Sequence, residues 1–134
     1  MSAGTWILVE DYEDAAARSY LAAIVLEDFG DPATSGHLYG LAAECAVKYF
    51  LESAGIMIDR HLKVHFPDLT IAIGLHGQGR TMLPLLGILQ GPPDLLSGYS
   101  IHSRYAQDNC VDDKLCGGWK ADTQRILSFC GFWI

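Results

Sequence analysis

Hydrophobic positions near the start of the chain recur at helical spacing. The segment from Asp11 to Asp28 has apolar residues at i, i+3, i+4 and i+7, and acidic residues in its first turn, where the helix dipole favours them. The pattern predicts a helix over this segment. Its expected core face consists of Ala17, Tyr20, Leu21 and Ile24.

The next segment, from Pro32 to Ala54, is apolar around most of its helical circumference. Asp31 fits the N-cap of this second helix, Pro32 fits its first position, and Gly55 fits its C-terminal stop. A helix of this kind is expected to lie between other helices. It leaves one narrow polar stripe with a spacing of four residues: Gly40, Glu44, Lys48 and Glu52.

Three more helices are predicted, at Pro67 to Leu75, Arg80 to Leu89 and about Val111 to Cys130, with glycine- and proline-containing breaks between them. In the last helix the paired glycines Gly117-Gly118 suggest close packing or a bend. Its expected core face is Leu115, Trp119, Ile126, Cys130 and Trp133. Because no segment alternates like a strand and no linker divides the chain, we expect a single all-α domain over residues 1–134.

Composition limits the functions that this domain can have. The chain is 50% hydrophobic and carries a net charge of −7, which disfavours a broad surface for non-specific nucleic-acid binding. It contains no apolar run of membrane-spanning length and no signal peptide at its start, so we expect a cytoplasmic location and no membrane partner. The four cysteines form no CxxC pair and are expected to be free, buried thiols: Cys45, Cys110, Cys116 and Cys130.

Two motifs give the chain a resemblance to the HEPN family over about residues 10 to 130. Ala43, Glu44 and Lys48, within Gly36 to Lys48, are similar to the A-E-x-x-x-K arrangement of the second HEPN helix. The segment from Ser100 to Ala106 resembles the W-S-x-x-x-R-Y segment before the last helix of one bacterial branch, with Tyr99 where that branch often has tryptophan. The resemblance implies an antiparallel four- to five-helix up-and-down bundle, usually dimeric.

The resemblance also implies a role in toxin–antitoxin or defence systems, as a metal-independent ribonuclease or as the partner of a minimal nucleotidyltransferase. Ribonuclease members are similar in carrying an arginine followed four to six residues later by a histidine, which moves a proton while arginine holds the phosphate. Counted from Arg104, the positions that should hold histidine are Asn109, Cys110 and Val111. The catalytic candidates are therefore Arg104 with the upstream His102, and the expected pair is incomplete.

The chain's basic cluster lies after the second helix and contains Arg60, His61, Lys63 and His65. Arg60 and His65 repeat the ribonuclease spacing at a different place in the chain, and the cluster is where an anionic ligand would dock. His61 and His65 could share a helix face and bind zinc with Asp68 or His76, but Pro67 interrupts that arrangement. We therefore expect neither a bound metal nor a cofactor.

The polar stripe of the second helix has two interpretations. Glu44 and Lys48 could form an ordinary i, i+4 ion pair, or they could line a polar groove with other candidate residues. The ligand-binding candidates under the second interpretation are Glu44, Lys48, His61, Arg104 and Tyr105. The incomplete catalytic pair favours a non-catalytic, homodimeric HEPN-like protein that binds a nucleotide, an RNA or a protein partner.

Two alternatives remain open at this stage. One is a ribonuclease that uses Arg104 with a non-standard histidine, or the basic cluster from Arg60 to His65. The other is a purely structural dimerisation module whose apolar end, Phe129 to Ile134, packs against another chain. The same aromatic residues could instead cap the domain's own core.

Overall fold

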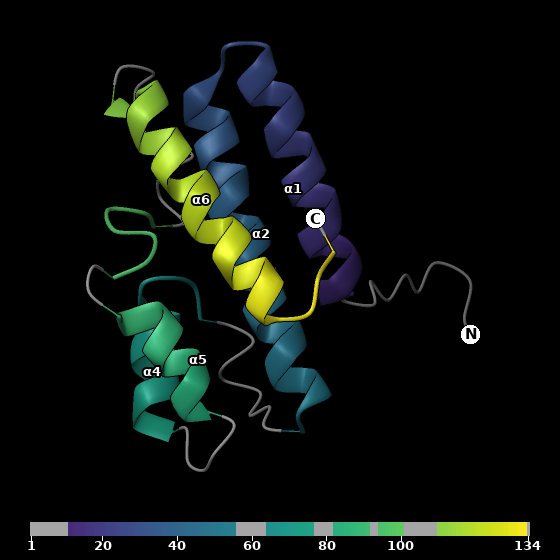
Figure 1. The fold of residues 1–134 in the computed structure, drawn as a ribbon, viewed down its shortest axis with the longest axis vertical. Coiled ribbons are helices and arrows are strands. Elements are labelled where there is room, and N and C mark those ends of the chain that lie inside the picture. Colours follow the sequence, from purple (N-terminus) through teal and green to yellow (C-terminus); the bar gives the residue numbers. More distant parts are fainter. Residues whose placement is uncertain (1–10, 56–63, 77–81, 92–93, 101–109, 134) are drawn as a thin grey trace, which may run out of the picture.

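The computed structural model describes residues 11–55, 64–76, 82–91, 94–100 and 110–133, which form five helices and no strand (Figure 1). The helices are α1 (Tyr12–Asp28), α2 (Pro32–Ser53), α4 (Asp68–His76), α5 (Met82–Gln90) and α6 (Asp113–Phe129). The all-α class predicted from the sequence is confirmed. Within the described ranges, no helix is both long and apolar enough to cross a membrane.

Each of the three long helices begins at an aspartate that caps its first turn. Asp11, Asp31 and Asp112 accept hydrogen bonds from the backbone N–H groups three residues further on, at 3.0, 3.1 and 2.8 Å. A capping carboxylate satisfies an N–H group that has no partner within the helix and interacts favourably with the helix dipole. The boundary predicted at Asp31 and Pro32 is therefore confirmed.

The second helix occupies the centre of the long-helix group, as its apolar circumference predicts. α2 packs against α1 and α6, while α4 and α5 pack together beside this group, with α5 contacting α6 (Figure 1). One hydrophobic cluster joins both parts. Its largest fully buried apolar side chains are Tyr39, Leu51, Leu69, Ile73, Leu85, Ile126 and Leu127.

Polar side chains cross-link the three long helices at the level of Tyr39. The Tyr39 hydroxyl of α2 donates a hydrogen bond to Glu27 of α1 at 2.7 Å, and its backbone oxygen accepts one from the Thr123 hydroxyl of α6 at 2.8 Å. Lys120 of α6 also pairs with Glu27 at 3.3 Å. These bonds fix the register of α2 against both neighbours and satisfy polar groups that would otherwise be buried without partners.

The face of α1 that packs against the core differs from the predicted one. Tyr20 is buried as expected, but Leu21 is 63% exposed and Ala17 is also exposed; the buried apolar positions are Tyr12, Ala16, Tyr20 and Ala23. The small alanine side chains let α1 approach α2 closely. The alanine face of α1 is therefore the buried one, although the larger hydrophobic residues alone would predict a different face.

Two expectations for the C-terminal part of the chain are wrong. Trp133 is fully exposed, although Trp119, Ile126 and Cys130 are buried as predicted. An added Cβ at Gly117 or Gly118 would meet no atom within 4 Å, so close packing is wrong for these glycines, while the alternative of a bend stays a prediction. Phe129 and Phe132 lie against Phe50 and Tyr49, which is the core-capping role that the sequence left open for this end.

Candidate functional site

The Glu44 carboxylate is the centre of a buried polar cluster. Its side chain is 2% exposed, and its Oε2 atom lies 3.3 Å from Lys48 Nζ and 2.8 Å from His65 Nδ1. Its Oε1 atom accepts a hydrogen bond from the backbone N–H of Phe66 at 3.1 Å. Glu44 therefore connects α2 to the segment that leads into α4.

Lys48 is as deeply buried as its partner, with a side chain that is 4% exposed. Its ammonium lies 5.8 Å from the centre of the Tyr12 ring, at the start of α1, within the range of a cation–π contact. A buried carboxylate needs hydrogen-bond donors around it and a buried ammonium needs acceptors, because burial without such partners is costly. The burial of both groups favours the structural interpretation of the polar stripe over a groove open to ligands.

Most of the other predicted site residues lie outside the described parts of the chain. His61, His102, Arg104 and Tyr105 belong to residues 56–63 and 101–109, so the convergence of these side chains with Glu44 stays a prediction. His65 is described, and its side chain is 46% exposed. Among the described residues, no three His, Cys, Asp or Glu side chains are placed to hold a metal ion.

Two aromatic rings cover the same face of α2 nearer its start, at Gly40 of the polar stripe and at Gly36, one turn before it. An added Cβ at Gly40 would overlap the ring of Tyr99, and one at Gly36 would lie 2.8 Å from the Trp119 ring. The two rings meet edge to face with their centres 5.5 Å apart, and Trp119 Nε1 donates to the backbone oxygen of Ser97 at 2.9 Å. Gly40 thus lets residues 94–100 lie directly on α2, and Gly36 lets Trp119 of α6 do the same.

His37 belongs to the same aromatic layer and was not singled out from the sequence. Its ring is buried and stacks on the Tyr99 ring, with the centres 6.3 Å apart and 28° between the planes. The Tyr99 hydroxyl also donates to the backbone oxygen of His37 at 3.4 Å. The four-residue spacing of Gly36 and Gly40 on an otherwise apolar helix is the signal that could have predicted a close aromatic cover here.

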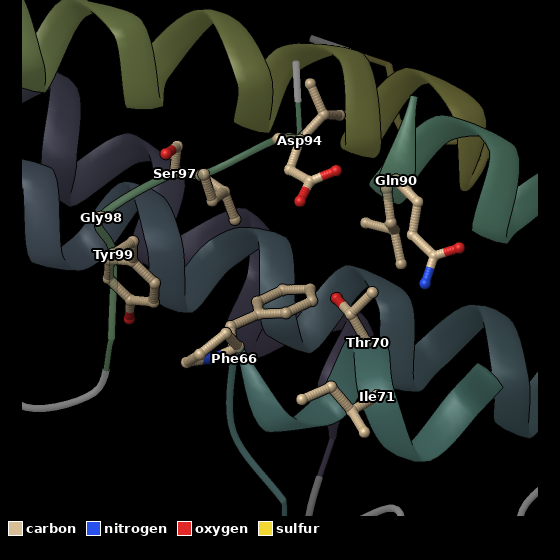
Figure 2. A pocket seen from close by; sticks show the side chains of 12 residues that line it. Phe66, Thr70, Ile71, Gln90, Asp94, Ser97, Gly98 and Tyr99 are labelled. Atoms are coloured by element: carbon tan, nitrogen blue, oxygen red, sulfur yellow. The ribbon is translucent and has the colours of Figure 1, made fainter. Parts of the chain in front are cut away.

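A pocket of about 460 Å³ opens between α4, α5 and residues 94–99 (Figure 2). Its apolar base includes the buried side chains of Phe66, Leu89, Leu96 and Tyr99. Thr70, Gln90, Asp94 and Ser97 supply polar groups, and Figure 2 shows Asp94 and Gln90 reaching into the pocket from the side opposite Phe66 and Thr70. Sequence patterns did not identify this pocket, because its walls come from three segments that only the fold brings together.

Three of the four cysteines are buried free thiols as predicted, whereas Cys110 is exposed. Burial raises the pKa of the Cys45 thiol to about 11 and that of the Cys130 thiol to about 12, since removal from water disfavours the thiolate. Such thiols are poor nucleophiles at neutral pH. They act here as small core residues.

Comparison with known proteins leaves the family open: no family model, curated protein or solved structure matches the chain. Nothing in that result bears on the HEPN resemblance, which stays a prediction from the motifs. The described fold and site define an all-helical protein in which a polar cluster is buried and a pocket lies beside it.

Proposed function

We propose that the protein is a HEPN-like, antiparallel helical bundle that acts as a homodimeric binding or regulatory protein without ribonuclease activity. Its ligand site is the pocket between α4, α5 and residues 94–99. The observation that carries this proposal is the combination of an accessible pocket with a buried, internally bonded Glu44. A role in a toxin–antitoxin or defence system, beside a nucleotidyltransferase partner, follows from the resemblance alone.

The chemistry of the two sites supports binding more than catalysis. Both oxygens of the Glu44 carboxylate accept bonds from the protein, so this group helps to hold the chain together. The pocket falls within the usual volume range of small-molecule sites, roughly 300–1,000 Å³, and combines an apolar base with a few polar groups. Binding there needs no charged cluster from α2.

A ligand panel tests the proposal directly. Adenine and guanine nucleotides, their nucleosides, short RNAs and small amines would be titrated by calorimetry into the full chain and into Thr70→Phe, which fills the pocket. We expect at least one compound to bind the natural chain and to bind Thr70→Phe at least tenfold more weakly. Thr34→Phe, at an exposed position on α2, is the matched control and should bind normally.

Two results would contradict the proposal. One is that no compound binds, or that every compound binds Thr70→Phe as well as the natural chain. The other is RNA cleavage by the purified protein that Arg104→Ala abolishes. Light scattering on the same samples tests the homodimer, which predicts twice the chain mass of 14.6 kDa.

One observation favours ribonuclease activity as a second candidate. His65 is half exposed, and its Nδ1 atom bonds to the buried Glu44 carboxylate at 2.8 Å. A carboxylate on one ring nitrogen fixes the tautomer of histidine and prepares the other nitrogen for proton transfer. His65 is the last residue of the basic segment from Arg60 to His65, where an RNA phosphate would dock.

The His65→Gln variant separates the two candidates. If the second is correct, the natural chain cleaves RNA and His65→Gln loses at least 100-fold of that activity, as general acid–base catalysis predicts, while its melting temperature falls by only a few degrees. An absence of cleavage across single-stranded and structured RNAs would eliminate the second candidate. Cleavage that persists in His65→Gln and disappears in His102→Ala would show that His102, not His65, is the catalytic histidine.

A further inference from the structure

We propose that the pocket beside α4 and α5 is selective for a small molecule with an apolar body and a protonated amine, and that Asp94 is the counter-ion of that amine. This inference rests on the proposed binding function and names the chemical class of its ligand. It is carried by the juxtaposition of a buried apolar base with a single, exposed carboxylate at the pocket wall.

The base of the pocket suits an apolar ring or chain. Phe66 and Leu89 are 4% exposed, Tyr99 is 3% exposed and Leu96 is 5% exposed, so their positions are fixed by the core before a ligand arrives. A rigid apolar surface binds an apolar body by releasing water, without ordering new side chains. At about 460 Å³ the pocket has room for a bicyclic aromatic ligand.

The charge of the pocket selects the polar end of the ligand. Asp94 is the one charged side chain among the described lining residues, and within the described parts of the chain its carboxylate has no hydrogen-bond or salt-bridge partner. Figure 2 shows that carboxylate directed into the pocket. An ammonium group placed there gains a charge-assisted hydrogen bond, whereas a phosphate or carboxylate is repelled.

Neighbouring charges act in the same direction. A second depression, on α6, shares Asp94 and Ser97 with the pocket and adds Asp112 and Asp122, against one cation, Lys114. Asp122 already accepts the backbone N–H of Leu96 at 2.9 Å, so the position of its charge close to the pocket is fixed. The resulting field is negative and adds to the chain's net charge of −7.

Uncharged groups complete the recognition of an amine. The Thr70 and Ser97 hydroxyls and the Gln90 amide oxygen can each accept a hydrogen bond, and an ammonium group has three N–H bonds to donate. Asp94 and Gln90 approach from one side of the pocket and Thr70 from the other (Figure 2). A ligand nitrogen between them would have several acceptors and no competing cation from the described lining residues.

Three indole probes of similar shape and different charge test the selectivity. Tryptamine is cationic, 3-methylindole is neutral and indole-3-propionate is anionic, and each would be titrated into the full chain by NMR, with the backbone signals of Ile71, Gln90 and Gly98 as site reporters. We expect tryptamine to bind about tenfold more tightly than indole-3-propionate. In Asp94→Asn, tryptamine should bind about fivefold more weakly, or about 1 kcal/mol, and 3-methylindole should change less than twofold.

Glu52→Gln is the matched control, since it removes the same charge at an exposed position of α2 that lines neither depression. It should leave all three affinities within twofold. Equal or tighter binding of indole-3-propionate, or an unchanged tryptamine affinity in Asp94→Asn, would overturn the inference. If no indole shifts the reporters but a nucleotide of the panel does, the amine selectivity fails and the binding function stands; if no compound shifts them, both fail.

Discussion

Glu44 joins two parts of the chain that are far apart in the sequence. It holds Lys48 on its own helix and both His65 and the Phe66 N–H on the segment before α4, all within 3.3 Å. Removing one member of a buried ion pair is far more costly than the small net contribution of an exposed pair. The A-E-x-x-x-K motif therefore has a structural explanation in this chain, apart from any resemblance.

Glu44→Gln tests that explanation, because it keeps the shape of the side chain and removes its negative charge. We expect a loss of about 3 kcal/mol in the free energy of unfolding, measured by urea denaturation at pH 7. Glu52→Gln makes the same change eight residues further along α2, at an exposed position, and should change stability by less than about 0.5 kcal/mol. Equal stability of the natural chain and Glu44→Gln would contradict the structural role.

The buried thiols predict how stability depends on alkaline pH. Cys45 and Cys130 have pKa values raised by burial to about 11 and about 12, so both stay protonated in the folded chain while they ionise in the unfolded chain above about pH 8.5. A raised folded-state pKa gives stability that is complete below the unfolded pKa and is lost as pH rises through the folded value. Burial raises the pKa of Tyr39 as well, which adds to the same trend.

We therefore expect the free energy of unfolding to fall between pH 8 and pH 10, with about 4 kcal/mol of the decrease due to the two thiols together. Urea denaturation of the natural chain and of the double variant Cys45→Ala/Cys130→Ala, at pH 8 and at pH 10, measures the part of the decrease that the two thiols cause. The double variant is less stable at pH 8 but should lose less stability on going to pH 10. An identical pH-dependent loss in both proteins would show that these thiols do not set it.

At the scale of the helices, the four-residue spacing along α2 organises the site. Gly36 and Gly40 receive the Trp119 and Tyr99 rings, and Glu44 and Lys48 continue the same row beneath the segment from residue 64. The sequence predicted this stripe and its helix. It could not predict what covers the stripe, because His65 and Tyr99 come from connections without periodicity and are far along the chain from Glu44 and Gly40.

Glycine substitutions distinguish the closely packed surface of α2 from the uncovered surface of α6. In Gly40→Ala the new methyl group overlaps the Tyr99 ring, so we expect a loss of about 1–3 kcal/mol in the free energy of unfolding. In Gly117→Ala the methyl group meets no atom within 4 Å, and the higher helix propensity of alanine should add about 0.5–1 kcal/mol. Urea denaturation measures both, and a stabilised Gly40→Ala would contradict the close approach.

Helix boundaries were easier to predict than helix faces. The Asp31 cap acts through a local hydrogen bond and Pro32 through its fixed backbone angle, so sequence alone located the start of α2. The α1 face was wrong because alanines are the residues that permit its close contact with α2, while Leu21 and Val25 are left exposed. The spacing of hydrophobic residues in the sequence shows that a helix is amphipathic. It does not show how closely the neighbouring helix packs against it.

At the scale of the whole molecule, the sequence predicted an all-helical chain around α2 and little of the pocket. Pocket residues such as Thr70, Gln90 and Asp94 carry no motif and come together only when α4, α5 and residues 94–99 are in place. The negative net charge of the chain, by contrast, follows directly from the sequence. It agrees with a pocket whose described lining carries one carboxylate and no cation.

The central claim is that ligands bind in this pocket while the Glu44 cluster serves the fold. Mapping the backbone NMR shifts that a bound panel compound produces tests it most directly. We predict that the largest shifts occur at Thr70, Ile71, Gln90 and Gly98, with small shifts at Glu44 and Lys48. Large shifts at Glu44, Lys48 and His65 that leave the pocket signals unchanged would contradict the account.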